Sequence, residues 1–434
     1  MTDSSPGLVR TIGRWSLTAL MINSILGVSI FRLPSDLALK LGGLSPLSCI
    51  AAAFGILIIA ACIAEVSSYY QETGGLYLYA RDALGPFAGL LVGWLTWLTR
   101  IAAPAAAANL FCAYLGQFLP VLANRKGELL VLAVLISHLA LLNYFGVQTG
   151  TSVSNFFTAV KVSFLLLFIL GGTLALLFRP EIRVPLTLPI TTGRDWFSSM
   201  LLLVYAFGGF EGALFVGGES KNPRRDTPIA LLSALAAVGI IYTAIQFVVV
   251  ATLPGAGTTS SPLYDSALRS LGPTSATAIG IAALISAYGY LSANLLHAPR
   301  ITYALAAKGD FPSILAAVHP RYRTPYVSII LYASFVFAFA ALGNFKWNAV
   351  LSAVSRLAVY GAMAFAVPVL RRRRPEQAQF KLPAPYLFAG LGVLFSLILL
   401  TQMGHNEFMI VAATCAIALI NWLAVRRIAV RSGS

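Results

Sequence analysis

Long apolar stretches alternate with short polar intervals along the whole chain of 434 residues. Each stretch has the roughly 20 residues that a helix needs to cross the hydrocarbon core of a bilayer. The pattern predicts an all-α integral membrane protein with twelve transmembrane helices. These helices are expected near 15–40, 45–68, 86–117, 128–145, 153–178, 196–219, 227–252, 275–305, 325–342, 347–370, 384–403 and 407–425.

Two of the stretches are interrupted at their centres by glycine and small polar residues. The first reads I-N-S-I-L-G-V-S-I-F-R-L-P over residues 22–34, and the sixth reads Y-A-F-G-G-F-E over residues 205–211. They lie five helices apart, and paired interruptions in two halves of a chain indicate a transporter built from inverted repeats. The predicted units are a cytoplasmic N-terminus (1–14), a first repeat of helices 1–5 (15–178), a second repeat of helices 6–10 (195–370), peripheral helices 11 and 12 (384–425) and a cytoplasmic C-terminus (426–434).

The interruptions have a physical consequence. An unsatisfied backbone group in hydrocarbon costs several kcal/mol, so a broken helix survives only where it lines a cavity. There, the amides that begin one half-helix favour an anion, and the carbonyls that end the other favour a cation. A zwitterion such as an α-amino acid satisfies both. The alternative for Gly27 alone is close helix packing through small residues.

Composition supports the membrane assignment and limits the partners. Apolar residues make up 58% of the chain and charged residues 10%, against about 25% charged in soluble proteins. The net charge of +15 could suggest nucleic acid, but many basic residues fall in the predicted cytoplasmic segments. That positive-inside bias predicts a plasma (inner) membrane protein with both termini cytoplasmic and no nucleic-acid partner. The residues concerned are Arg371 to Arg374, Arg426, Arg427 and Arg431.

Four ordered motifs then carry a resemblance to a known family. They are L-G-V-S-I-F-R-L-P (26–34), A-E-V-S-S-Y-Y-Q-E-T-G-G-L-Y-L-Y (64–79), F-G-G-F-E with G-G-E-S-K-N-P-R-R-D-T-P (207–228), and N-L-L-H-A-P-R-I-T-Y-A-L-A-A-K-G-D-F-P (294–312), which runs on to H-P-R-Y-R-T-P (319–325). Over roughly 12–375 the chain resembles the amino acid–polyamine–organocation transporters. The resemblance implies the 5+5 inverted-repeat fold, with helices 1 and 6 broken, and alternating access.

The resemblance also implies a substrate site at the two breaks. The substrate carboxylate is expected at the amides of Gly27, Val28 and Ser29. The α-amine is expected at the carbonyls of Ile25, Tyr205 and Gly208. An aromatic side chain at Tyr205 is expected to cover the substrate, with Phe207 beside it. Ser29 departs from the family, which usually has a second glycine at this position.

Two ionisable residues are candidates for coupling or gating. Lys161 lies in the cytoplasmic third of helix 5, near the position where sodium-coupled relatives bind their ion. Its ammonium is expected to replace that ion and to bind helix 1 carbonyls; the alternative is snorkelling to the cytoplasmic interface. Glu211 directly follows the break in helix 6. It is expected either to take part in gating or proton sensing, or to accept the amides that the break frees.

Arg100 lies in the middle of helix 3, at a position that faces the substrate in related exchangers. It could bind a substrate carboxylate bidentately, which would indicate acidic substrates, or it could form an internal ion pair with Glu211 or Glu65. Arg356 is expected to support helix packing or a cytoplasmic gate without touching the substrate. His297 is expected to be a hydrogen-bonded helix residue.

The predicted function is secondary active transport of amino acids, coupled to protons or exchanging, rather than coupled to sodium. Neutral L-amino acids are the first choice because the mapped pocket is apolar, aromatic and rich in small residues. The alternatives are acidic amino acids through Arg100, or an amino acid sensor built on a transporter fold. No P-loop, catalytic cluster or metal-ligand spacing is present, so neither an enzyme nor a cofactor or metal site is predicted. The expected partners are an amino acid, protons and the lipid bilayer; the oligomeric state stays open.

Overall fold

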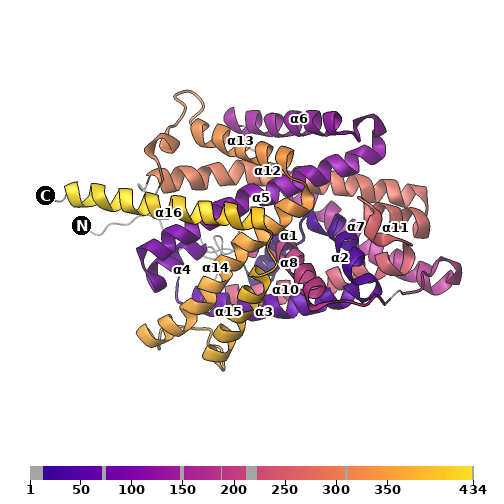
Figure 1. Ribbon diagram of the computed structural model, residues 1–434, viewed down its shortest axis with the longest axis horizontal. Helices are drawn as coiled ribbons and strands as arrows, with labels where there is room; N and C mark the ends of the chain where they lie inside the picture. Colours follow the sequence, from indigo (N-terminus) through magenta and orange to yellow (C-terminus); the bar gives the residue numbers. More distant parts are fainter. Residues whose placement is uncertain are drawn as a thin grey trace.

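The computed structural model describes residues 13–70, 75–146, 151–186, 188–211, 222–307 and 311–432, and these residues contain helices and no strands (Figure 1). The all-α prediction is therefore confirmed for the described part of the chain. Eight stretches in it are long and apolar enough to cross a membrane. Two shorter apolar helices, Tyr326–Leu342 and Pro385–Leu400, accompany them. The protein is a multi-pass membrane protein.

The long helices lie where the hydrophobic pattern predicts them. They are α3 (Ser45–Ser67), α5 (Pro86–Phe118), α6 (Arg125–Tyr144), α7 (Thr151–Phe178), α10 (Pro223–Thr252), α12 (Pro273–Ala307), α13 (Tyr326–Leu342), α14 (Phe345–Arg373), α15 (Pro385–Leu400) and α16 (His405–Ser432). Short 3-10 turns connect several of them: Gly42–Leu44, Pro120–Leu122, Pro180–Ile182, Ala256–Thr258 and Ser313–Ala316.

Both predicted breaks fall at helix ends in the structure. The first stretch divides into α1 (Arg14–Ile25), a 3-10 turn (Ser29–Phe31) and α2 (Leu33–Leu41). The sixth stretch begins with α8 (Gly193–Phe207), which ends at Gly208. The continuation of helix 6 through 212–219 lies outside the described residues.

The helices pack as two groups joined by a third element. In the first group, α10 packs against α1 and α3, and α8 packs against α3. In the second, α12 packs against α5 and α6, and α13 against α5 and α6. Helix α14 contacts α5 of one group and α3 and α8 of the other, and it crosses the centre of the molecule in Figure 1.

Two short helices were not predicted: α4 (Gly75–Leu84) and α11 (Pro262–Leu271). Both are amphipathic and too short to span a bilayer, so a pattern of long apolar stretches does not predict them. Helix α11 nonetheless has a readable signal, because Pro262 occupies the first helical position and Gly272 follows the last one.

The basic end of α14 forms ion pairs with acids of α3 and α4. Arg371 binds the carboxylate of Glu65 through two nitrogens, at 2.5 and 3.0 Å, and the Leu382 amide donates to the same carboxylate at 2.8 Å. Arg374 binds Asp82 at 3.0 and 3.1 Å. Glu65 is fully buried, so Arg371 supplies the charge that lets an acid remain inside α3.

Removal of Arg371 is expected to destabilise the protein more than removal of Glu65. Arg371→Gln leaves a buried carboxylate without its countercharge, which costs about 3–5 kcal/mol. Glu65→Gln leaves only a partly exposed arginine, because the Arg371 side chain is 21% exposed. The midpoint of thermal unfolding in detergent measures both variants.

Glu376→Gln is the matched control, since Glu376 forms an ion pair with Lys381 but is 91% exposed. Its midpoint is expected to stay close to wild type. Equal midpoints for Arg371→Gln and Glu376→Gln would contradict a structural role for the buried pair.

Candidate functional site

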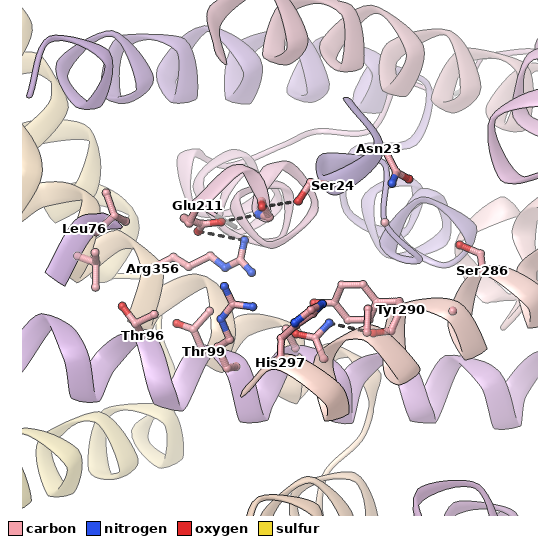
Figure 2. A pocket seen from close by; sticks show the side chains of 18 of the residues that line it. Asn23, Ser24, Leu76, Thr96, Thr99, Glu211, Ser286, Tyr290, His297 and Arg356 are labelled. Carbon is pink, nitrogen blue, oxygen red and sulfur yellow. Dashed lines mark hydrogen bonds and ion pairs between the residues drawn. The ribbon is translucent and has the colours of Figure 1, made fainter. Parts of the chain in front are cut away.

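A cavity of about 320 Å³ lies where the two helix breaks face α5, α12 and α14. Figure 2 shows its walls: Asn23 and Ser24 come from α1, Thr96 and Thr99 from α5, and Ser286, Tyr290 and His297 from α12. The volume is at the lower end of what small-molecule sites have. Most of the lining side chains are polar or charged.

The two breaks are joined directly by hydrogen bonds. The Ser24 hydroxyl donates to the Gly209 carbonyl at 2.6 Å. The Tyr242 hydroxyl, from α10, lies 3.0 Å from the Ile25 carbonyl and 3.2 Å from the Ala206 carbonyl. Carbonyls freed at the end of α1 and α8 thus find partners inside the protein, as membrane burial requires.

The glycine pair after α8 permits this close approach. Gly209 has φ +116°, and a Cβ there would lie 2.3 Å from the Ser24 carbonyl oxygen. A Cβ on Gly208 would lie 1.1 Å from a guanidinium nitrogen of Arg356. A side chain at either position would therefore push away α1 or Arg356.

Lys161 reaches the end of α1. Its Nζ donates to the Asn23 backbone carbonyl and to the Asn23 side-chain oxygen, each at 3.1 Å. The side chain is buried and lines the cavity. This is the contact with a helix 1 carbonyl that the sequence predicts, and it differs from the snorkelling alternative.

Glu211 is held by three groups. Its carboxylate accepts the Gly209 amide at 2.6 Å and the Tyr360 hydroxyl, and it lies 3.4 Å from Arg356. The bond to the Gly209 amide matches the structural role predicted for this acid. A role in gating or proton sensing stays a prediction.

Arg356 packs against the second break and also lines the cavity. It comes from the middle of α14, is buried, and points toward Glu211 in Figure 2. Its close approach to Gly208 agrees with the packing role expected from the sequence, whereas its place on the cavity wall was not expected. Its Nη1 lies 3.4 Å from a carboxylate oxygen of Glu211, and its Nε has no hydrogen-bond partner within the described residues.

Arg100 also lines the cavity, beside Thr96 and Thr99 on the same face of α5. The predicted internal ion pair is wrong, because Glu211 pairs with Arg356 and Glu65 pairs with Arg371. Among the residues that the structure describes, no acid lies within ion-pairing distance of Arg100. Its guanidinium therefore faces the cavity without a countercharge from this part of the chain.

A family model described as amino acid permease matches residues 12–420. The chain belongs to the amino acid permease family. This permease is therefore a transporter and not an enzyme, and the resemblance read from its motifs is confirmed.

Three relatives from Bacillus subtilis (strain 168) are similar along nearly the whole permease. A methylthioribose transporter is 28% identical, covering 91% of this chain and 89% of its own. A branched-chain amino acid permease is 27% identical, covering 93% and 90%. A serine/threonine exchanger is 26% identical, covering 88% of each chain.

Several predicted site residues of the permease lie beside the cavity without lining it. Gly27, Arg100, Lys161 and Glu211 line it, together with Gly209. The others are buried around the breaks: Ile25, Val28, Ser29, Tyr205, Phe207 and Gly208. Their predicted contact with substrate stays untested.

Two aromatic residues in the last turn of α8 are engaged in packing. The Tyr205 hydroxyl lies 3.5 Å from the Ala103 carbonyl. Phe207 packs against Tyr242, with ring centroids 5.3 Å apart. Tyr205 therefore touches the α5 wall of the cavity, while Phe207 supports the tyrosine that joins the breaks.

The α12 wall was missed, yet its spacing was readable. Ser286, Tyr290, Asn294 and His297 recur every three or four residues, so they share one face of a helix. The same spacing relates Thr96, Thr99 and Arg100 on α5. The His297 side chain has no hydrogen bond within the described residues, so a hydrogen-bonded role for its ring is not found.

The Gly208→Ala variant of the permease tests the contact between the breaks and α14. The added Cβ forces the Arg356 guanidinium away from Glu211, which costs about 3–5 kcal/mol if the buried pair breaks. We expect a lower midpoint of thermal unfolding and loss of substrate uptake in proteoliposomes.

Gly390→Ala serves as the matched control, since a Cβ at Gly390 in α15 meets nothing within 4 Å. This variant is expected to behave as wild type. If Gly208→Ala kept the same unfolding midpoint and uptake as Gly390→Ala, the close packing of Arg356 on Gly208 would be needed neither for stability nor for transport.

Proposed function

We propose that this permease is a secondary active amino acid transporter that works by alternating access. It is coupled to protons, or exchanges substrates, rather than being coupled to sodium. The observation that carries the proposal is the position of Lys161, whose ammonium binds both oxygens of Asn23 at the end of α1. A fixed cation there leaves no place for a sodium ion.

Helix contacts support the proposed fold of twelve spans with 5+5 inverted repeats at 15–178 and 195–370. Corresponding members of the two repeats pack together: α3 with α10, α5 with α12, and α6 with α13. A pseudo-twofold axis in the membrane plane produces such pairs. Helices α15 and α16 are the peripheral pair, and α16 exposes Phe408, Met409, Ile417 and Ile420.

The proposed substrate site uses the backbone of both breaks. Within the described residues, the amides of Val28 and Ser29 have no hydrogen-bond partner, whereas the Gly27 amide donates to the Ile25 carbonyl at 2.6 Å. The two unpaired amides suit the substrate carboxylate. The Ile25 carbonyl already accepts from Gly27 and from Tyr242, and the Tyr205 carbonyl accepts the Gly208 amide at 3.3 Å. Of the three carbonyls expected to meet the amine, that of Gly208 is the one without a donor among the described residues.

Two substrate classes are compatible with this function: neutral amino acids and amino acids with an acidic side chain. The neutral class rested on an apolar pocket, but three cations and one acid line the cavity: Arg100, Lys161, Arg356 and Glu211. Two of the relatives, a branched-chain amino acid permease and a serine/threonine exchanger, are named for neutral amino acids.

We place the permease in the plasma (inner) membrane with both termini cytoplasmic, because the basic residues gather in the segments expected there.

Lys161→Met tests the coupling. Removal of the ammonium empties the cation position at Asn23, so uptake of radiolabelled amino acids into proteoliposomes is expected to lose its response to an inward proton gradient. Sodium is expected to have no effect on the wild type. Thermal unfolding of Lys161→Met in detergent shows whether the variant is folded.

The matched control is Lys126→Met, which removes an exposed lysine at the start of α6. It is expected to keep the wild-type response to the gradient. Folded Lys161→Met protein with the wild-type rate and pH profile would remove Lys161 from the mechanism.

A further inference from the structure

The cavity carries more positive than negative charge. Arg100, Lys161 and Arg356 line it, and Glu211 is its one acid among the described residues. Glu211 lies 3.4 Å from Arg356, and the oxygens that bind Lys161 belong to the uncharged Asn23. The cavity thus has three cationic side chains and one carboxylate among the described residues. That carboxylate pairs with Arg356 and not with Arg100.

Such an excess is costly inside a membrane. An arginine at the centre of a span costs about 2.5–3.5 kcal/mol on insertion scales, and it cannot lose its proton in a protein. Lysine can discharge during a transport cycle, but the two arginines stay charged throughout. An anion that arrives with the substrate would supply the charge that the described residues lack.

The two arginines enter one cavity from different helices. Arg100 lines it from α5 and Arg356 from α14, with Tyr290 of α12 on the same cavity. The buried Nε of Arg356 has no hydrogen-bond partner among the described residues, while its Nη1 faces Glu211 at 3.4 Å. Thr96 lines the cavity one helical turn before Arg100, whereas the Thr99 hydroxyl already donates to the Leu95 carbonyl at 3.0 Å. This wall therefore offers an anion the Arg100 guanidinium and the Thr96 hydroxyl.

We propose that the α5–α14 wall is a second anion subsite, which selects amino acids with a carboxylate side chain. Arg100 is the specificity-determining residue, and Arg356 assists it while remaining paired with Glu211. The proposal rests on the proposed function, because the breaks in helices 1 and 6 hold the α-amino and α-carboxyl groups. A neutral amino acid would leave the Arg100 charge uncompensated.

Pairs of isosteric substrates test the subsite without any mutation. L-Glutamate and L-glutamine differ by the side-chain charge and little in shape, as do L-aspartate and L-asparagine. In thermal-shift titration and proteoliposome uptake with wild-type protein, the acid of each pair is expected to bind about 10- to 100-fold more tightly than its amide. Glutarate, which lacks the amine, is expected to compete more weakly than L-glutamate.

Arg100→Gln tests the residue. The variant is expected to lose about 10- to 100-fold in affinity for L-glutamate while its affinity for L-glutamine does not fall. A merely structural role would weaken both substrates alike. Arg269→Gln, on the exposed face of α11, is the matched control and is expected to keep the wild-type preference.

The outcomes separate the two proposals. Uptake of L-leucine or L-glutamine without binding of L-glutamate or L-aspartate would overturn the anion subsite and leave amino acid transport standing. No uptake or binding of any amino acid would overturn both. An unchanged preference in Arg100→Gln would overturn the assignment to Arg100, and equal competition by glutarate would overturn the amino acid as the ligand of the combined site.

Discussion

Every peptide group inside a membrane must find a partner, and this requirement shapes the centre of the molecule. The ends of α1 and α8 release carbonyls deep in the fold. The Tyr242 hydroxyl lies within hydrogen-bond distance of the carbonyls of both Ile25 and Ala206, and the Ser24 hydroxyl donates to the carbonyl of Gly209. These contacts close the two breaks on each other, so the cavity opens toward α5, α12 and α14 rather than between α1 and α8.

Two acidic side chains inside the fold also have partners from neighbouring helices. Glu65 is fully buried and pairs with Arg371, and Glu211, whose side chain is 13% exposed, binds Arg356 and Tyr360. Each acid thereby has a donor set fixed by a neighbouring helix, and α14 supplies the arginine in both cases. Helix α14 thus has paired arginines both at the cavity and at its basic end. It joins the two groups of packed helices through ionic as well as apolar contacts.

The sequence predicted the long helices well because a bilayer demands lengths that stand out in any hydrophobic pattern. It also located both breaks, since Gly27 and the Gly208–Gly209 pair are poor choices for an uninterrupted span. The sequence did not show that Glu211 pairs with Arg356 and Glu65 with Arg371, because pairing depends on which helix faces meet. The spacing of the polar residues in α5 and α12 indicates one polar face on each helix. These faces were not predicted because the spans were defined by their apolar residues.

The division of labour between main chain and side chains at the cavity has an evolutionary consequence. Peptide groups at the ends of α1 and α8 are present whatever residues surround them, so substitution cannot readily remove them. The wall formed by α5, α12 and α14 consists of side chains such as Thr96, Arg100 and Tyr290, each one codon change away from different chemistry. Substitutions in α5, α12 and α14 can therefore change the chemistry of the cavity while the main-chain groups at the helix ends stay in place.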